Sequence, residues 1–265
     1  MNTGPGEKLA FIGTGKIAEV WMDRLITRGA SPTNVMACDV RPERLAQIRR
    51  EFKTVQTSAD NREAARFARV LVLATPPGEV LKVLAQLKGE LSAEHLLVCL
   101  AAGVPLAKLE EVAKVSVVRV MPNTPALVGE AMNLVAYGTS VSPSQRAFLE
   151  TLLEKLGDWY EVDDGLMEYW CALCAVGPTY LFPVVEALSS AATARGIPAE
   201  QALDASAQLL IGVGKLIQES EKSVAELQQM ISLHTLREED AKHLFTDAYN
   251  DAVAKLEGLA RRMAA

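Results

Sequence analysis

The feature that most constrains the fold is an alternation of continuous apolar runs and helical patterns through residues 7–162. The apolar runs are typical of buried strands and lie at 9–13, 35–38, 70–74, 96–103 and 115–120. Further strands are expected at 133–138 and 158–162. Strands that are apolar on both faces and are connected by helices indicate a mostly parallel sheet covered on both sides. We therefore expect a doubly wound α/β domain over residues 1–162.

The pattern changes after residue 162, where strand signals end and only helical patterns follow. The segment 178–196 is apolar around most of its circumference in its first half, and 238–263 carries apolar residues at steps of three and four. A helix that is apolar on nearly all sides must be buried, and a segment of this length offers few neighbours. We therefore expect residues 163–265 to form an all-α dimerisation domain, with a self-contained helical cap as the alternative.

The charge balance of the chain narrows the classes of partner. Lys and Arg number 27 and Asp and Glu 33, which gives a net charge of -6 at pH 7. An acidic protein is poorly suited to nucleic acid or to an anionic membrane as its main partner. No run of about 18 apolar residues predicts a transmembrane helix, and the first residues lack the features of a signal peptide. The expectation is a cytoplasmic protein without a nucleic-acid or membrane partner.

The cysteines and histidines of the chain do not suggest a metal centre. Cys171 and Cys174 form a C-x-x-C pair, but no second pair or nearby histidine completes a zinc set. A thioredoxin-like pair would follow a strand, whereas this one lies in a helical pattern. The three histidines are too scattered to suggest a shared site. We expect reduced thiols, with this pair serving as small core residues, and no metal.

A glycine-rich turn in the first strand–helix unit predicts a dinucleotide site. The stretch FIGTGKIAEV contains Gly13, Gly15 and Ala18 as G-x-G-x-x-A, between a predicted strand and a predicted helix. Gly13 permits the tight turn, Gly15 lets the backbone approach a pyrophosphate, and Ala18 keeps helix and strand close. The helix N-terminus adds amides and a positive dipole for the phosphates. In this context the pattern indicates a Rossmann-type domain.

Two residues at the end of the second strand bear on the choice of cofactor and give conflicting signals. Asp39 lies 24 residues after Gly15, where an acidic side chain accepts hydrogen bonds from ribose hydroxyls and repels a 2′-phosphate. Arg41 could instead pair with a 2′-phosphate. The sequence therefore favours NADH weakly over NADPH, and Asp39 as an ordinary turn residue is the alternative.

Three consecutive strand ends carry small or proline-stiffened segments that would border the cofactor crevice. ATPPGE follows the fourth strand, and AAGVP, beginning at Ala101, leaves room for a flat ring after the fifth. MPNTP ends the next strand, and Pro122 and Pro125 fix the backbone on either side of Asn123 and Thr124. We expect this rigid turn to form the wall on which a nicotinamide rests.

Together these stretches resemble the pyrroline-5-carboxylate reductase family, whose members make proline from a cyclic imine. The matching segments are FIGTGKIAE, AAGV, RVMPNTPALVGEAMN, GPTYLFPVVEAL and, more loosely, PAEQALDASAQLLIGVGKLI. The resemblance implies NAD(P)H-dependent reduction of pyrroline-5-carboxylate to proline. It also implies that the helical domain, which would carry the substrate, interlocks with a second subunit as a homodimer or a larger assembly of dimers.

The resemblance also assigns roles to individual residues, residue by residue. It assigns Gly13, Gly15, Lys16, Ile17 and Ala18 to the pyrophosphate, Asn61 to the adenine-side ribose, and Thr75, Pro76 and Asn123 to the cofactor lining. Together with Thr14, Asp39, Arg41 and Ala101, which the motif and the strand ends indicate, these are the expected cofactor residues. Asn123 and Thr124 would lie beside the nicotinamide and, with Thr179, take part in catalysis. Gly177, Pro178 and Thr179 match the helix start that faces the substrate, where backbone amides suit a carboxylate.

The chain departs from the family pattern mainly where the substrate carboxylate would be held. CALCAVGPTY lacks the serines that the family has before Gly-Pro, and the family's S-P-G-G-T-T loop is replaced by MISLHTLREED. Ser232 and Thr235 remain as donors, and Thr75 stands where the family has a lysine before Pro76. Two alternatives therefore stay open: a reductase of another imine or carbonyl compound, and a regulatory dimer that binds dinucleotide without catalysis.

Overall fold

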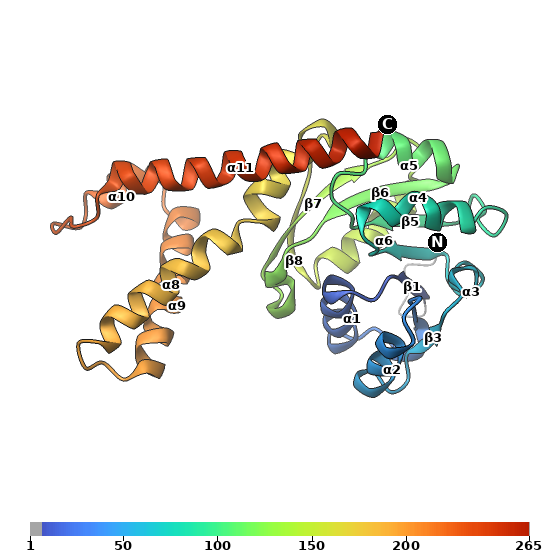
Figure 1. Ribbon diagram of the computed structural model, residues 1–265, viewed down its shortest axis with the longest axis horizontal. Helices are drawn as coiled ribbons and strands as arrows, with labels where there is room; N and C mark the ends of the chain where they lie inside the picture. Colours follow the sequence, from blue (N-terminus) through green and yellow to red (C-terminus); the bar gives the residue numbers. More distant parts are fainter. Residues whose placement is uncertain (1–6, 265) are drawn as a thin grey trace. The chain divides into compact units, whose positions relative to one another are not determined.

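The computed structural model describes residues 7–264 and contains one eight-stranded sheet (Figure 1). The strands are β1 (Leu9–Ile12), β2 (Val35–Cys38), β3 (Gln56–Ser58), β4 (Val70–Leu73), β5 (Leu96–Cys99), β6 (Ser116–Met121), β7 (Ala131–Tyr137) and β8 (Gly157–Glu161). Their order is β3-β2-β1-β4-β5-β6-β7-β8, and all pairs are parallel except β6 with β7. The expected doubly wound, mostly parallel sheet is confirmed.

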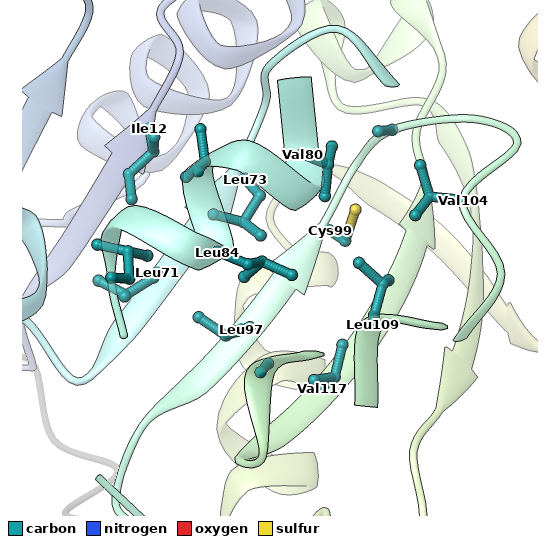
Figure 2. Close-up of a cluster of buried hydrophobic side chains, with 14 of the residues drawn as sticks. Ile12, Leu71, Leu73, Val80, Leu84, Leu97, Cys99, Val104, Leu109 and Val117 are labelled. Carbon is teal, nitrogen blue, oxygen red and sulfur yellow. The ribbon is translucent and has the colours of Figure 1, made fainter. Parts of the chain in front are cut away.

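Helices cover both faces of the sheet, as continuous apolar strands require. They are α1 (Lys16–Thr27), α2 (Pro42–Glu51), α3 (Asn61–Phe67), α4 (Pro77–Gln86), α5 (Leu106–Ala113), α6 (Pro143–Leu153) and α7 (Met167–Trp170). Alternate residues of each strand enter two separate clusters of buried side chains, with α3, α4 and α5 on one face and α1, α2 and α6 on the other. Figure 2 shows the first cluster, where Leu73, Leu84 and Leu97 lie close together.

The sheet order places a crevice near the middle of the sheet. The chain runs outward from β1 to β3, then returns to place β4 on the other side of β1. In open α/β sheets a ligand binds at the carboxyl ends of the strands at such a reversal. The glycine turn, Asp39 and the segment after β4 all begin at these carboxyl ends.

The chain divides into two compact units, residues 1–175 with 252–265, and residues 176–251. The first unit extends past the expected boundary at residue 162, because Met167 and Cys171 pack in the core of the sheet domain. The last turns of α11 (Glu238–Ala264) also belong to it, since Leu256 and Met263 pack against the same cluster. We call these the sheet unit and the helical unit.

The helical unit contains long helices with little buried surface. Its elements are α8 (Pro178–Thr193), α9 (Ala199–Glu219), α10 (Val224–Gln228) and the first part of α11. α8 packs along α9, yet α8 has no fully buried residue, and α9 buries only Ala202 and Ser206. The expected all-α character is confirmed.

One stretch of the chain is long and apolar enough to cross a membrane by length and composition, which the sequence expectation did not anticipate. It spans Asp164–Thr193, and 17% of its most apolar window is buried. Its first turns carry Asp164 and Glu168, both ion-paired with Arg119 on β6. These pairs tie that end of the stretch to the sheet.

Two local features were not expected from the sequence. β3 is short and partly exposed, so it lacked an apolar signal. Residues Cys171–Ala175 form a π-helical turn directly before α8, where a regular helix had been expected. Pro178 gives a reason for this turn, because it has no N–H to donate to the carbonyl of Cys174 four residues earlier.

Candidate active site

A cavity of about 720 Å³ lies in the sheet unit at the carboxyl ends of the central strands. Ten of the expected cofactor residues line it: Gly13, Thr14, Gly15, Ile17, Asp39, Arg41, Asn61, Thr75, Pro76 and Ala101. Lys16, Ala18 and Asn123 do not line it. The structure therefore brings together, around one cavity, residues that lie up to 88 positions apart in the sequence, between Gly13 and Ala101.

The two glycines of the turn serve different purposes. Gly13 has φ of 85°, and a Cβ there would lie 2.8 Å from the carbonyl oxygen of Ala74. This position thus needs glycine for both conformation and space. A Cβ on Gly15 would meet no atom within 4 Å, and Gly15 lines the cavity. Its missing side chain leaves room for a ligand rather than for the protein itself.

Thr14, between the two glycines, is fully buried and bonded on every side. Its N–H and its hydroxyl both donate to Asp39 Oδ2, at 3.0 and 2.8 Å. Its carbonyl accepts from Nε of Arg44 on α2, and Arg44 also pairs with Glu19 on α1. The conformation of the glycine turn is thus fixed before any ligand binds, so less conformational entropy is lost on binding.

The carboxylate of Asp39 is shared between the glycine turn and Arg41. Arg41 donates its backbone N–H and Nε to Oδ1 and a terminal nitrogen to Oδ2, all at 2.9 to 3.0 Å. Burial alone would raise the pKa of Asp39, but the hydrogen bonds from Arg41 and Thr14 hold that pKa well below its usual range. Asp39 is therefore ionised at any physiological pH, with every lone-pair direction in use.

The remaining residues of the glycine turn play supporting parts. The Lys16 side chain is 86% exposed and pairs with Glu19 at 3.4 Å. Ala18 is fully buried and packs in the second core cluster, between α1 and the sheet. A larger residue at Ala18 would push the helix away from the strands, as expected for this position.

Asn61 and Thr75 lie on the walls of the cavity: Asn61 begins α3, and Thr75 lies two residues before α4. Asn61 Nδ2 donates to Oε1 of Gln86 at 2.9 Å, which holds the amide in place. The Thr75 hydroxyl is buried and has no hydrogen-bond partner among the described residues. A buried unpaired hydroxyl costs about 1–3 kcal/mol, so a ligand that bonds to it would remove that penalty.

Asn123 follows β6 and is buried. Its Nδ2 donates to the carbonyl of Cys174 at 3.2 Å, the carbonyl that Pro178 cannot reach with an N–H. Its Oδ1 has no partner within the described part of the chain. Thr124 begins a 3₁₀ helix (Thr124–Val128) and is exposed. This 3₁₀ helix packs against α1.

The expected substrate residues belong to the helical unit. Gly177 precedes α8, and Pro178 and Thr179 begin it. Both the N–H and the hydroxyl of Thr179 donate to the carbonyl of Val176, at 2.9 and 2.7 Å. Because Pro178 has no N–H, this helix start offers fewer free amides than the sequence suggested.

Thr179 also lines an apolar cavity of about 460 Å³ within the helical unit, between α8 and α11. Leu188, Leu244 and Phe245 contribute to its walls. Ser232 and Thr235 do not line it and are exposed between α10 and α11. Their hydroxyls are therefore open to solvent in this chain.

Sequence reasoning missed Gln86 and Lys82 in the cavity lining, and it missed Arg44 and Glu19, which hold the glycine turn without lining the cavity. Arg44 is only 9% exposed, and with Asp39 it fixes Thr14 from both sides. An arginine on a predicted helix gives no signal of this contact without the fold. The four cysteines are free, and burial raises the pKa of Cys38 and Cys171 to about 12, as expected for inert thiols. In residues 7–264 no group of three or more His, Cys, Asp or Glu could hold a metal ion.

Two family models match separate parts of this chain. The family described as NADP oxidoreductase coenzyme F420-dependent matches residues 8–103, which include the glycine turn and all the residues that line the cavity. The family described as pyrroline-5-carboxylate reductase dimerisation matches residues 164–259.

Relatives and solved structures match nearly the whole chain. Pyrroline-5-carboxylate reductase of Methanosarcina acetivorans is 31% identical, over 97% of this chain and 99% of that protein. The enzyme of Corynebacterium melassecola is 34% identical over 84% of each chain. A structure of the Coxiella burnetii enzyme has 29% identity and a TM-score of 0.80, covering 96% of this chain and 99% of that one. The Plasmodium falciparum enzyme with NADP bound has the same fold, with a TM-score of 0.86, 22% identity and coverage of 97% and 99%.

Proposed function

This chain belongs to the pyrroline-5-carboxylate reductase family, and from that premise we propose that it reduces pyrroline-5-carboxylate to proline with NADH or NADPH. The observation that carries the proposal is the cavity at the sheet reversal. Around it lie the glycine turn, an ionised Asp39 and the small residues that follow β5. These are the features that a dinucleotide requires, arranged along its length.

The residues that are present fit a dinucleotide. The space beside Gly15 that a Cβ would occupy is open, and the buried Thr75 hydroxyl lacks a protein partner among the described residues. We assign the pyrophosphate to Gly13–Ala18 and the adenosine ribose to Asp39 and Asn61. Thr75, Pro76 and Ala101 would line the middle of the site. When bound, the dihydronicotinamide supplies the hydride.

The preference between NADH and NADPH depends on the Asp39–Arg41 pair. A ribose diol would take the place of Arg41 on the carboxylate, whereas a 2′-phosphate would use the N–H groups of Arg41 that Asp39 leaves free. Both groups line the cavity, and we propose a modest preference for NADH because the Asp39 side chain is only 5% exposed while the Arg41 side chain is 55% exposed. Since Arg41 can serve either ligand, we expect NADPH to be accepted as well.

The substrate carboxylate is assigned to the helical unit. The Thr179 hydroxyl and the backbone around Gly177 are the proposed donors, with Ser232 or Thr235 in place of the missing family loop. For the Thr179 hydroxyl to donate to a carboxylate, it must rotate away from the carbonyl of Val176. We therefore expect weaker substrate binding than a complete loop would give.

The reaction itself needs little acid–base machinery. A protonated cyclic imine is already electrophilic, so it can accept hydride without a general acid among the side chains. Asn123 and Thr124, beside the nicotinamide, and Thr179, on the substrate side, would act mainly by holding the two reactants in register. The stiff backbone between Pro122 and Pro125 suits this role.

We further propose a homodimer, or a larger assembly of dimers, formed through the helical unit. The match to the family's dimerisation domain and the exposed apolar surface of α8 and α9 support it. The apolar stretch Asp164–Thr193 would then face other helices rather than lipid. We also propose a cytoplasmic location without a membrane or nucleic-acid partner, in keeping with the net charge of -6.

The deciding experiment follows nicotinamide absorbance with pyrroline-5-carboxylate and with an analogue that lacks the carboxyl group. We expect the acid to be preferred by at least about tenfold, because each lost hydrogen bond to a charged group costs about 1.5–3 kcal/mol. Equal turnover of the two compounds would favour a reductase of another imine or carbonyl substrate. No turnover of any imine despite cofactor binding would favour the regulatory alternative.

A further inference from the structure

A cluster of three charged side chains, of which Arg119 is buried and Asp164 and Glu168 are partly exposed, joins β6 to the segment that follows β8. Arg119 on β6 is 2% exposed, and its two terminal nitrogens donate to Asp164 Oδ1 and Glu168 Oε1, at 2.5 and 2.8 Å. Asp164 Oδ2 also accepts the N–H of Leu106, the first residue of α5, at 2.9 Å. The Arg119 guanidinium thus joins β6 to the helical segment after β8, and Asp164 links the same cluster to the start of α5.

The composition of this cluster is not explained by stability. It carries one more negative than positive charge, and both Arg119 Nε and Glu168 Oε2 are buried without a partner among residues 7–264. A buried ion cluster is often no more stable than apolar side chains of the same volume. What the cluster does fix is geometry, because a guanidinium bonds in a plane and in set directions.

The same two segments meet again at Asn123, four residues after Arg119. Asn123 Nδ2 donates to the carbonyl of Cys174, six residues after Glu168. That carbonyl is free because Pro178 has no N–H, and the π-helical turn at Cys171–Ala175 presents it to β6. The bond decides which way the Asn123 amide faces, leaving Oδ1 as its acceptor.

We propose that Arg119, Asp164 and Glu168 are positioning residues for hydride transfer, acting through Asn123. This inference rests on the proposed function, in which Asn123 lies beside the nicotinamide. The ion pairs of Arg119 hold β6 against the segment 164–175 at Asp164 and Glu168. The Asn123–Cys174 hydrogen bond joins the same two segments further along the chain. We call the ion pairs the clamp. Without the clamp the amide and the turn that carries it would sample several positions, and the reacting atoms would lose their register.

The test uses a double variant, Arg119→Met with Glu168→Met, which removes the two more deeply placed charges, while Asp164, whose side chain is 26% exposed, keeps the N–H of Leu106. A single Arg119→Met would strand Glu168 and could fail to fold. The matched control is Arg146→Met with Glu161→Met, an exposed ion pair between α6 and β8. The measurements are the melting temperature, the Kd for NADH, kcat with pyrroline-5-carboxylate, and the kinetic isotope effect with NADH deuterated at the transferred position.

We expect the buried double variant to fold and to bind NADH within about threefold of wild type, while kcat falls roughly ten- to a hundredfold, as misplacement of reacting groups does. The isotope effect should rise, because hydride transfer becomes the slow step, and the control should change neither quantity. A folded buried variant with kcat and isotope effect as in wild type would overturn the proposal.

A structural measurement separates this inference from the proposed function. In a crystal structure of the buried variant, the Asn123 amide should leave the carbonyl of Cys174 or adopt more than one position. An unmoved amide would refute the clamp, whatever the substrate proves to be. If wild-type protein reduces no imine, the proposed function fails, and the crystal structure alone then decides whether the cluster positions Asn123.

Discussion

The sheet unit and the helical unit bury their apolar residues in opposite ways. In the sheet unit every residue of β1, β2, β4 and β5 is buried, and the helices complete two cores around them. In the helical unit large apolar side chains such as Phe182 and Ile211 remain exposed, at 65% and 51%. The first unit forms its core within one chain, whereas the second leaves large apolar side chains exposed, and through this surface we propose that the dimer forms.

The largest effect is expected from charging that surface. In Phe182→Asp with Ile211→Asp, two carboxylates would enter the proposed dimer interface, each at a cost of several kcal/mol, and symmetry doubles the number. We expect loss of the dimer by light scattering and loss of helical signal by circular dichroism. Val112→Asp, on the sheet unit, is the matched control and should leave both signals intact. A double variant that stays dimeric would show that the exposed apolar surface of the helical unit is not the dimer interface.

The next largest effect is expected on NADH binding, from a substitution in the glycine turn that leaves the hydrophobic core unchanged. Gly15→Val adds a side chain where the protein has no neighbouring atom within 4 Å. It should spare the melting temperature but weaken NADH binding by roughly a hundredfold, since overpacking against the pyrophosphate costs 1–3 kcal/mol. Calorimetry measures both. Unchanged affinity would mean that the glycine turn does not contact the cofactor.

A smaller effect is expected from a substitution in the helical unit that should weaken substrate binding without changing cofactor binding. Thr179→Val removes the proposed hydroxyl donor and should raise KM for pyrroline-5-carboxylate by about tenfold or somewhat more. The Kd for NADH should stay the same, because Thr179 lies in the helical unit. Thr179→Ser, which keeps the hydroxyl, is the control and should remain close to wild type. A KM unaffected by the valine would place the carboxylate elsewhere.

The smallest effect concerns Arg41. Arg41→Ala frees Asp39 for the ribose diol and removes the only proposed partner of a 2′-phosphate. The ratio of kcat/KM with NADH to that with NADPH should rise by about three- to tenfold, in keeping with the small free energies of exposed ion pairs. Arg50→Ala, on the same helical segment but away from the cavity lining, is the control. A ratio that falls instead would reverse the assigned roles of Asp39 and Arg41.

The fold of the sheet unit was predictable because its signals are local. Each continuous apolar run became a strand within a few residues of its expected ends, and the range expected for β2 matched the structure residue for residue. β3 was missed because it is short and partly exposed, and the antiparallel pairing of β7 has no local signature. Sequence periodicity reports burial, so it fails where a strand is exposed or where direction depends on the connecting path.

The candidate site was predictable only where a motif carried it. Gly13, Gly15 and Asp39 were found by spacing, and the structure places them around one cavity. Arg44 and the buried Arg119 cluster were missed, because their partners lie 25 to 49 residues away along the chain. The two hydrogen bonds from the Thr179 N–H and hydroxyl to the Val176 carbonyl were also not predicted, since they depend on the backbone geometry at the start of α8.

The final turns of α11 have a consequence for how this protein is made. Leu259 lies so close to Gly103 that a Cβ there would approach it to 2.6 Å, and Leu256 and Met263 pack on the first core cluster. These residues leave the ribosome after the whole helical unit, although the sheet they complete is synthesised first. The core of the sheet unit is therefore incomplete until late in translation, and the apolar surface around Gly103 stays exposed to solvent until then. A chain that stalls within the helical unit would expose this surface to chaperones and proteases, which gives the cell a way to recognise it as incomplete.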